Sequence, residues 1–185
     1  MNSYTREVLP PPAQIVSAGR CILGTFNGPI RDINLLDLQR PLGFRAPRAF
    51  NAFRLKEWQA FQVNNEDWFI CLAVYDTKSV GIAIVMAYHK SAQRMYRYEH
   101  KVPSWRLQAS NGLYDSKCFY HSPDLSIDIH NHLANNRFEI SVSIKGFRDS
   151  PDLTAHWTAY HSTEPSVIVQ PFADNRPLYS HKALM

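Results

Sequence analysis

One strand-like segment carries the residues of this sequence that are best suited to hold a metal ion. From Leu125 to His132 apolar and polar residues alternate, so Asp128, His130 and His132 fall on one strand face. Two histidines spaced in this way can place two imidazoles on zinc, with a third ligand from elsewhere and Asp128 as a ligand or as a carboxylate behind one. The same residues equally suit the solvated face of an amphipathic hairpin, and we expect no metal and no cofactor.

Acid–base chemistry has fewer candidates, and each has a structural alternative. His156 and Tyr160 share a predicted strand face with Thr154 and Thr158, which makes them an acid–base pair if that face lines a cavity, or surface groups if it does not. Asp76 ends an apolar run, where it is either a carboxylate with a raised pKa or the cap of a turn. The sequence contains no HExxH motif and no phosphate-binding glycine loop, and its seven glycines argue against a dinucleotide fold. The catalytic residues are therefore left unassigned.

These residues need strands to position them, and the stretch Arg54–Lys101 predicts such strands. It contains runs rich in Val, Ile, Phe, Tyr and Trp, separated by polar breaks at residues 64–67, 77–79 and 90–93. Strand-forming runs separated by turn residues are typical of an antiparallel meander. We predict that the rest of the chain is organised around this sheet.

Both faces of the central two strands of this meander are apolar. Strand alternation puts a bulky set on one face (Trp68, Ile70, Leu72 and Val74, then Val80, Ile82, Ile84, Met86 and Tyr88). The other face mixes small residues with larger ones (Phe69, Cys71, Ala73 and Tyr75, then Gly81, Ala83, Val85 and Ala87). We expect the bulky face to form the core, the small face to line a ligand cavity or meet a second sheet, and both to be shielded from water. The candidate ligand-binding residues are Trp58, Phe69, Tyr75 and Tyr88.

The remaining segments complete an all-β prediction with little helix. Leu125–His132 and Arg137–Lys145 form a second hairpin with one polar face, and further strands are expected near 153–159 and, as the last, at 167–169. Residues 45–53 are interpreted as an irregular connector. Residues 1–18 are predicted to be a disordered lead-in, and 19–185 a β-barrel-like domain.

Composition excludes several classes of protein. Apolar residues make up 45% and aromatic residues 12%, which excludes global disorder. No run approaches the roughly 18 to 20 apolar residues of a membrane span, and the N-terminus lacks the apolar core of a signal peptide. Three dispersed cysteines form neither a disulfide framework nor a metal pair, which favours the cytoplasm. Residues 1–54 hold seven arginines and three acids, suited to phosphate contact or to local packing and pairing, and we expect no nucleic-acid partner.

Four stretches resemble one known family. They read GTFNGPIRDINLLD (Gly24–Asp37), RLKEWQAFQVNNEDWFICLAVYD (Arg54–Asp76), VPSWRL (Val102–Leu107) and VIVQPFADNRPLYSHKALM (Val167–Met185). The chain is similar to the family catalogued as domain of unknown function 2804. Its members resemble lipocalin-type barrels and, more remotely, paired β-barrels such as carotenoid hydratases and tocopherol cyclase, which handle isoprenoid lipids.

The resemblance implies a meander that forms a lipocalin-like barrel or open half-barrel. It also implies that the chain is the first half of a two-barrel protein, whose exposed sheet docks the second half or another copy. Trp58 then either closes the base of the barrel or contacts the ligand. The expected function is binding of a hydrophobic small molecule, a lipid or isoprenoid. The alternative is an acid–base enzyme of the hydratase or cyclase type acting on such a molecule.

Overall fold

The computed structural model describes residues 7–40, 44–147, 150–162, 164–172 and 176–184. The fold is all-β, and its strand pairings are antiparallel apart from a short parallel pair near the N-terminus. Contacts divide the chain into a terminal unit, Met1–Ala52 with Tyr160–Met185, and a central unit, Phe53–Ala159. Across the described residues, no helix combines the length and the hydropathy needed to span a membrane.

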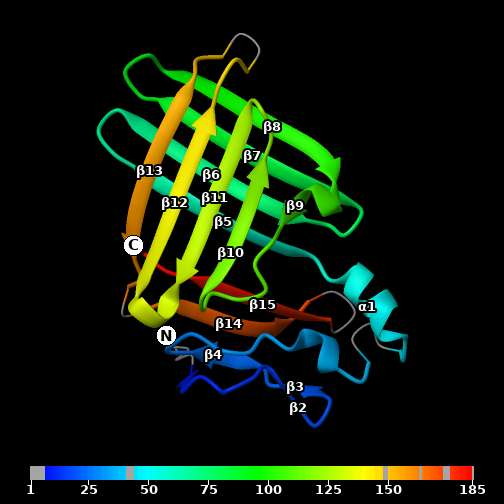
Figure 1. Ribbon diagram of the computed structural model, residues 1–185. Coiled ribbons are helices and arrows are strands. Elements are labelled where there is room, and N and C mark those ends of the chain that lie inside the picture. Colours follow the sequence, from blue (N-terminus) through cyan, green and yellow to red (C-terminus); the bar gives the residue numbers. More distant parts are fainter. Residues whose placement is uncertain (1–6, 41–43, 148–149, 163, 173–175, 185) are drawn as a thin grey trace, which may run out of the picture. The chain divides into compact units, whose positions relative to one another are not determined.

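The central unit begins with the predicted meander. Its four strands pair in chain order (Figure 1): β5 (Glu57–Asn64), β6 (Trp68–Asp76), β7 (Val80–His89) and β8 (Arg94–Pro103). The predicted breaks are its turns. The Asn65 side-chain oxygen accepts the main-chain N–H of Trp68 at 2.7 Å, and the Asp76 carboxylate accepts that of Lys78 at 2.6 Å. Side chains of this type mimic a backbone turn, which explains why the strands end there.

A five-stranded sheet forms the other half of the central unit. Its order is β13 (Leu153–Tyr160), β12 (Arg137–Ile144), β11 (Leu125–His132), β10 (Ser116–His121) and β9 (Leu107–Gln108). The 3-10 turn η2 (Ser104–Arg106) leads into β9, and η3 (Leu133–Asn135) joins β11 to β12. Asn136 closes this link in the left-handed conformation, with a φ of 55°. The link confirms the predicted second hairpin.

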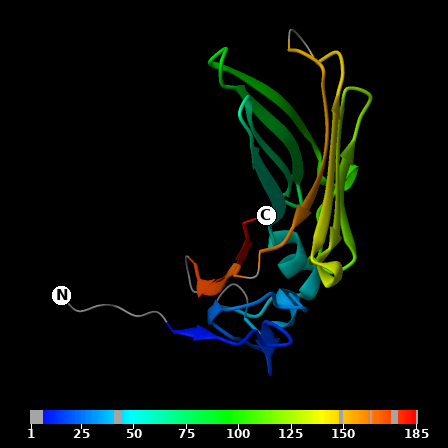
Figure 2. The same cartoon turned by 90° about the vertical axis from the view of Figure 1, so that its left-hand side faces the viewer.

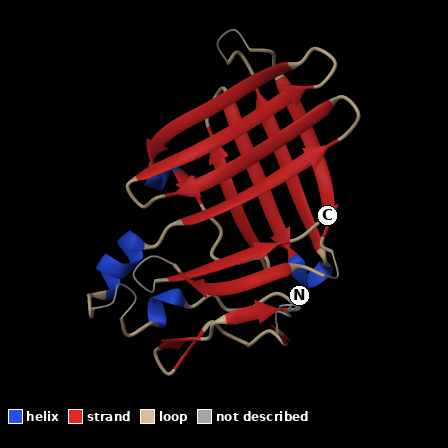
Figure 3. Cartoon of the chain, turned by 180° about the vertical axis from the view of Figure 1, so that it is seen from behind, coloured by secondary structure: helices blue, strands red, loops and turns tan. Residues whose placement is uncertain are grey.

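The two sheets of the central unit are separate layers around one core. Figure 2 shows the layers edge-on, and Figure 3 shows the strands of one sheet running across those of the other. No pairing between described strands joins the two sheets, so they form an open sandwich and not a closed barrel. The largest fully buried side chains come from both layers: Leu72, Val74, Val85, Tyr98, Leu125, Ile127, Ile129, Phe138, Ile140 and Ile144.

The predicted core face is correct for β6 and wrong for β7. On β6 the bulky set faces the core. On β7 the small set faces the core instead, and Gly81, Ala83, Val85 and Ala87 are buried. Close approach of the layers is the physical reason, because a Cβ atom on Gly81 would lie only 2.4 Å from Leu107 Cδ2. The bulky residues of β7 therefore lie on the outer face.

The terminal unit has a core of its own. Its sheet contains β1 (Val8–Leu9), β4 (Gly24–Phe26), β14 (Ser166–Pro171) and β15 (Pro177–Lys182), beside a hairpin of β2 (Val16–Ser17) and β3 (Arg20–Cys21). Ile15, Phe26 and Val167 are buried in its core. Residues 7–18 of the predicted lead-in thus contribute β1, β2 and core side chains. The sequence did not predict the short strands β1 to β4 and β9, the strand β15 or the helix α1 (Arg48–Arg54). Helix α1 lies in the expected irregular connector and follows the 3-10 turn η1 (Leu35–Asp37).

Candidate functional site

All four predicted ligand-binding residues lie on the outer face of the four-stranded sheet. Trp58 of β5 pairs with Tyr75 of β6, and Phe69 of β6 pairs with Tyr88 of β7. The two pairs are six residues apart along β6, a separation of about 20 Å at the rise of an antiparallel strand. The rings of Trp58 and Tyr75 meet edge to face, with centroids 5.7 Å apart. The structure thus places these four residues on one outer face, whereas the prediction put Tyr88 on the core face and Phe69 and Tyr75 on the opposite, small-residue face.

Between the two aromatic pairs the outer face is mostly apolar, with the exposed amide side chain of Gln62 beside Cys71 as the polar exception. We call this surface the apolar face and define it by Trp58, Ala60, Phe69, Cys71, Ala73, Tyr75, Ile82, Ile84, Met86, Tyr88 and Met95. Trp58 is 53% exposed, Phe69 36% and Met95 55%, and Tyr75, Ile84 and Tyr88 are half-buried. The expectation that both sides of the sheet are shielded from water is therefore wrong for this side. The cause is that a sheet packs only one of its faces against the core between the two layers, so the second apolar face of β6 and β7 remains outside.

A shallow open depression lies at one end of the apolar face. Its volume is about 210 Å³, and it is lined by Trp58, Ala73 and Tyr75. The small side chain of Ala73, next to Ala60 in the register, forms its floor, and the two aromatic rings form its wall. Enclosed ligand sites have volumes of roughly 300 Å³ and more, so a ligand here would extend along the face.

Charged side chains of β8 border the apolar face. Arg97, Glu99 and Lys101 lie on the same side of the sheet as Met86, Ile84 and Ile82, their register partners on β7. Glu99 forms ion pairs with Arg97 and with Lys101, the latter at 3.3 Å. The hydrogen bond from Arg97 holds the pKa of the Glu99 carboxyl below its usual value. The border therefore carries one positive charge in excess, at the edge of a neutral surface.

The outer face of the five-stranded sheet has the opposite character. We call it the histidine face and define it by His121, Asp128, His130, His132, Glu139 and His156. The predicted alternation of β11 is confirmed, because Leu125, Ile127 and Ile129 are buried and the polar residues between them are half-exposed. Asp128, the proposed partner of His130 and His132, instead lies 2.7 Å from His121 Nε2 on β10.

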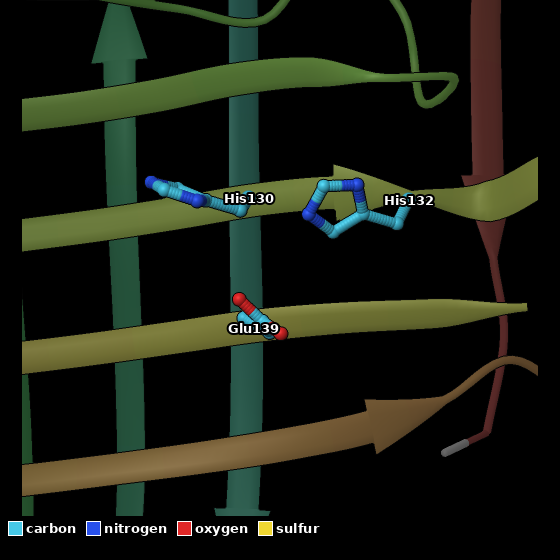
Figure 4. Close-up of side chains that lie close together, drawn as sticks. All are labelled: His130, His132 and Glu139. Atoms are coloured by element: carbon cyan, nitrogen blue, oxygen red, sulfur yellow. The ribbon is translucent and has the colours of Figure 1, made fainter. Parts of the chain in front are cut away.

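Glu139 of β12 lies where a metal site on His130 and His132 would need its third ligand. It pairs with His130 in the β11–β12 register. One potential ligand atom from each of His130, His132 and Glu139 lies within 4.8 Å of the other two, and the three side chains lie close together in Figure 4. The sequence pattern found the two histidines but missed Glu139. The length of the hairpin link could have identified Glu139. A link of residues 133–136 places residue 132 opposite residue 137, and two residues further along each strand it places residue 130 opposite residue 139.

The acid–base candidates lie in other places. His156 and Tyr160 are exposed on β13, and His156 Nδ1 lies 2.9 Å from the hydroxyl of Ser141, which fits the surface interpretation. Asp76 bonds the main-chain N–H of Lys78 and pairs with its ammonium at 2.8 Å, which fits the turn interpretation. None of these three candidate residues lines the depression on the apolar face.

A polar cluster that the sequence analysis missed joins β8 to the β10–β11 turn. His100 Nδ1 lies 2.8 Å from the Tyr120 hydroxyl, and His100 Nε2 lies 3.3 Å from the Asp124 carboxylate. Ser122 donates to Asp124 at 2.8 Å, and this bond is the main cause of the lowered pKa of the Asp124 carboxyl. Tyr120 is only 3% exposed, so the cluster binds the strands together around a buried phenol. Its members are distant in sequence, and no local spacing identifies them.

Comparison with known proteins gives one match. No curated protein and no solved structure matches the chain. The sequence profile of the family described as domain of unknown function (DUF2804) matches residues 7–185, nearly the whole chain and including both units. The chain belongs to the DUF2804 family.

Proposed function

We propose that the central unit binds a hydrophobic small molecule, a lipid or an isoprenoid, along the apolar face. The observation that carries the proposal is the gathering of Trp58, Phe69, Tyr75 and Tyr88 on one exposed sheet face with aliphatic side chains between them. Apolar surfaces of this kind on proteins mark interaction sites, and burying apolar area contributes about 25 cal/mol per Å². The lipocalin resemblance supports the ligand class, whereas the open sandwich supports a position on the sheet and not inside a barrel.

The shape of the face favours an extended ligand. The two aromatic pairs are about 20 Å apart, and the small residues Ala60, Ala73 and Cys71 lie between them, with Gln62 on the β5 side of Cys71. Ile82, Ile84 and Met86 of β7 flank these small residues. The positively charged excess at Arg97, Glu99 and Lys101 suits a carboxylate at one end or side of the molecule. A fatty acid or an isoprenoid acid combines these properties.

The alternative, acid–base catalysis on a lipid, finds little support at this site. The depression is lined by an indole, a methyl group and a phenol, and it contains no carboxylate or imidazole. A general acid or base needs a titratable group within hydrogen-bond reach of the substrate. Binding is therefore the function that the geometry favours.

The test uses the full untagged chain and the fluorescent probe 11-(dansylamino)undecanoic acid. Wild type should give saturable, blue-shifted probe fluorescence. Ile84→Lys places a charge at the centre of the apolar face and should weaken binding at least tenfold, equivalent to about 1.4 kcal/mol. Ser143→Lys is the matched control on the outer face of the other sheet and should bind as wild type does. Circular dichroism checks that both variants fold.

Three outcomes would overturn the proposal. The first is the absence of saturable probe binding by wild type, and the second is equal binding by Ile84→Lys and Ser143→Lys. The third is a wild-type protein that sediments as a dimer, becomes monomeric on Ile84→Lys substitution and binds no probe. In that case the occupant of the apolar face is a second copy of the chain.

A further inference from the structure

We infer that His130, His132 and Glu139 form a binding site for a zinc-type divalent transition-metal ion on the histidine face. The sequence alone led us to expect no metal, because the two histidines equally suit the solvated face of an amphipathic hairpin. The register supplies that ligand in Glu139, directly opposite His130. Two imidazoles and one carboxylate are a ligand set that zinc accepts. This site lies on the other sheet from the apolar face, so the two proposals stand or fall independently.

The backbone that carries the three ligands is held firmly. β11 lies between β10 and β12; it is paired with β12 along its whole length and with β10 from Ser126 to Asn131. The neighbours of the ligands in the chain point into the core, where Ile129, Asn131, Phe138 and Ile140 are at most 1% exposed. Asn131 is also fixed by hydrogen bonds from its amide to Ser116 at 2.9 Å and to Gln59 at 3.1 Å. Ligands on strands anchored in this way are positioned more accurately than ligands on loops.

Small side-chain rotations complete the site. Zinc–nitrogen and zinc–oxygen bonds of roughly 2.0 to 2.2 Å put the ligand atoms of a tetrahedral site about 3.4 Å apart. The ligand atoms of His130, His132 and Glu139 lie within 4.8 Å of one another, so closure needs movements of about 1 Å. All three side chains are half-buried, which leaves them room to rotate and leaves the ion accessible from solvent.

Neighbouring charges orient two of the ligands. The Asp115 carboxylate lies 3.6 Å from His132 Nδ1, which favours a proton on that nitrogen and leaves Nε2 for the ion. Arg137 Nη2 lies 3.1 Å from one oxygen of Glu139 and leaves its other oxygen free to bind the metal. Carboxylates and hydrogen-bond donors behind the ligands are a regular feature of protein metal sites.

The ligand count indicates the kind of site. Structural zinc sites have four protein ligands, whereas sites with three protein ligands keep a position for water or another small molecule. The His130–His132–Glu139 site belongs to the second kind. Its fourth position faces away from the core, on the solvent side of the sheet.

The test is calorimetric titration of the full untagged chain with zinc chloride, after dialysis against a chelator and then into chelator-free buffer. Wild type should bind one zinc ion with a dissociation constant in the micromolar range or below. His132→Ala and Glu139→Gln should each weaken binding at least tenfold. His156→Ala removes an imidazole from the same face outside the site and should bind as wild type does. Cobalt(II) added to wild type should give the visible absorption bands of a four-coordinate site.

Three results would overturn the inference. They are the absence of heat at micromolar zinc, undiminished binding by His132→Ala, and equal loss in His156→Ala. Thermal unfolding without metal serves as the folding check. Because Glu139→Gln keeps the size of the side chain, loss of zinc binding with an unchanged midpoint identifies a lost ligand and not a disrupted sheet.

Discussion

The apolar face and the histidine face belong to sheets that share one core, and both are produced by the same alternation of side chains. On β11 and β12 the alternation separates apolar from polar residues, so the outer face carries imidazoles and carboxylates. On β6 and β7 both sets are apolar, so one set forms the core and the other remains at the surface. The difference shows that apolar residues that are not needed to form the core are the ones to examine for function. An apolar set on an outer strand face costs solubility and is retained where it binds something.

The largest expected effect separates the two sides of β6. Leu72→Ala removes a side chain with no exposed surface and should lower the free energy of unfolding by about 2 to 5 kcal/mol. Cys71→Ala, one residue away on the apolar face, should lower it by less than about 1 kcal/mol. Urea denaturation measures both. Equal losses would mean that the apolar face is a second core layer and not a surface.

The next effect concerns histidines that are buried, in contrast to those of the histidine face. Burial, and to a smaller extent His161, whose Nε2 lies 2.7 Å from that of His181, together lower the pKa of His181 in the terminal unit to about 4. Between pH 6.5 and pH 4, His181 therefore binds a proton in the unfolded chain but not in the folded chain. Stability should fall across this window by about 2 kcal/mol, allowing for solvent screening of a partly exposed ring.

Urea denaturation of wild type and His181→Gln at pH 7.5, 5.5 and 4.5 isolates this contribution. The variant should lose less stability than wild type between the first and last pH. Parallel losses in the two proteins would show that His181 accepts a proton in the folded state as readily as in the unfolded chain.

Sequence reasoning predicted the meander and the β11–β12 hairpin because alternation and turn residues are local properties. It did not predict which face of β7 forms the core, since that depends on the contact of Gly81 with Leu107 across the two sheets. Helix α1 was missed because a short segment such as Arg48–Arg54 has too few residues to show a helical period.

The candidate sites were predictable to different degrees. Trp58, Phe69, Tyr75 and Tyr88 were selected together, and their common face follows from strand parity once the register of β5, β6 and β7 is known. Glu139 was accessible from the length of the hairpin link, but it was not found. The cluster of His100, Tyr120 and Asp124 was beyond prediction, because it requires the contact between β8 and β10.

A smaller effect compares two exposed tryptophans. Trp58→Ala removes a wall of the depression on the apolar face and should weaken binding of the dansyl probe about fivefold, on the order of 1 kcal/mol. Trp105 of η2 is 81% exposed and lies outside that face, so Trp105→Ala should leave binding unchanged. Fluorescence titration compares them. An equal loss in both variants would mean that exposed aromatic rings bind the probe wherever they lie.

The smallest effect concerns the charged border of β8. Arg97→Gln removes one positive charge beside Met86 and should weaken binding of the carboxylate probe about two- to threefold at low salt. The methyl ester of the same probe should bind equally well to wild type and variant. If Arg97→Gln weakened ester binding as much as acid binding, the charged border would not act by attracting the carboxylate of the ligand.

Methyl NMR of isoleucine-labelled protein during titration with oleate tests the central claim most directly, because it locates the ligand on the protein. Ile82 and Ile84 lie on the apolar face, whereas Ile127 and Ile140 are buried between the sheets. We expect saturable shifts at Ile82 and Ile84 and almost none at Ile127 and Ile140. Shifts concentrated at the buried pair, or no saturable shift at any isoleucine, would contradict binding on the apolar face.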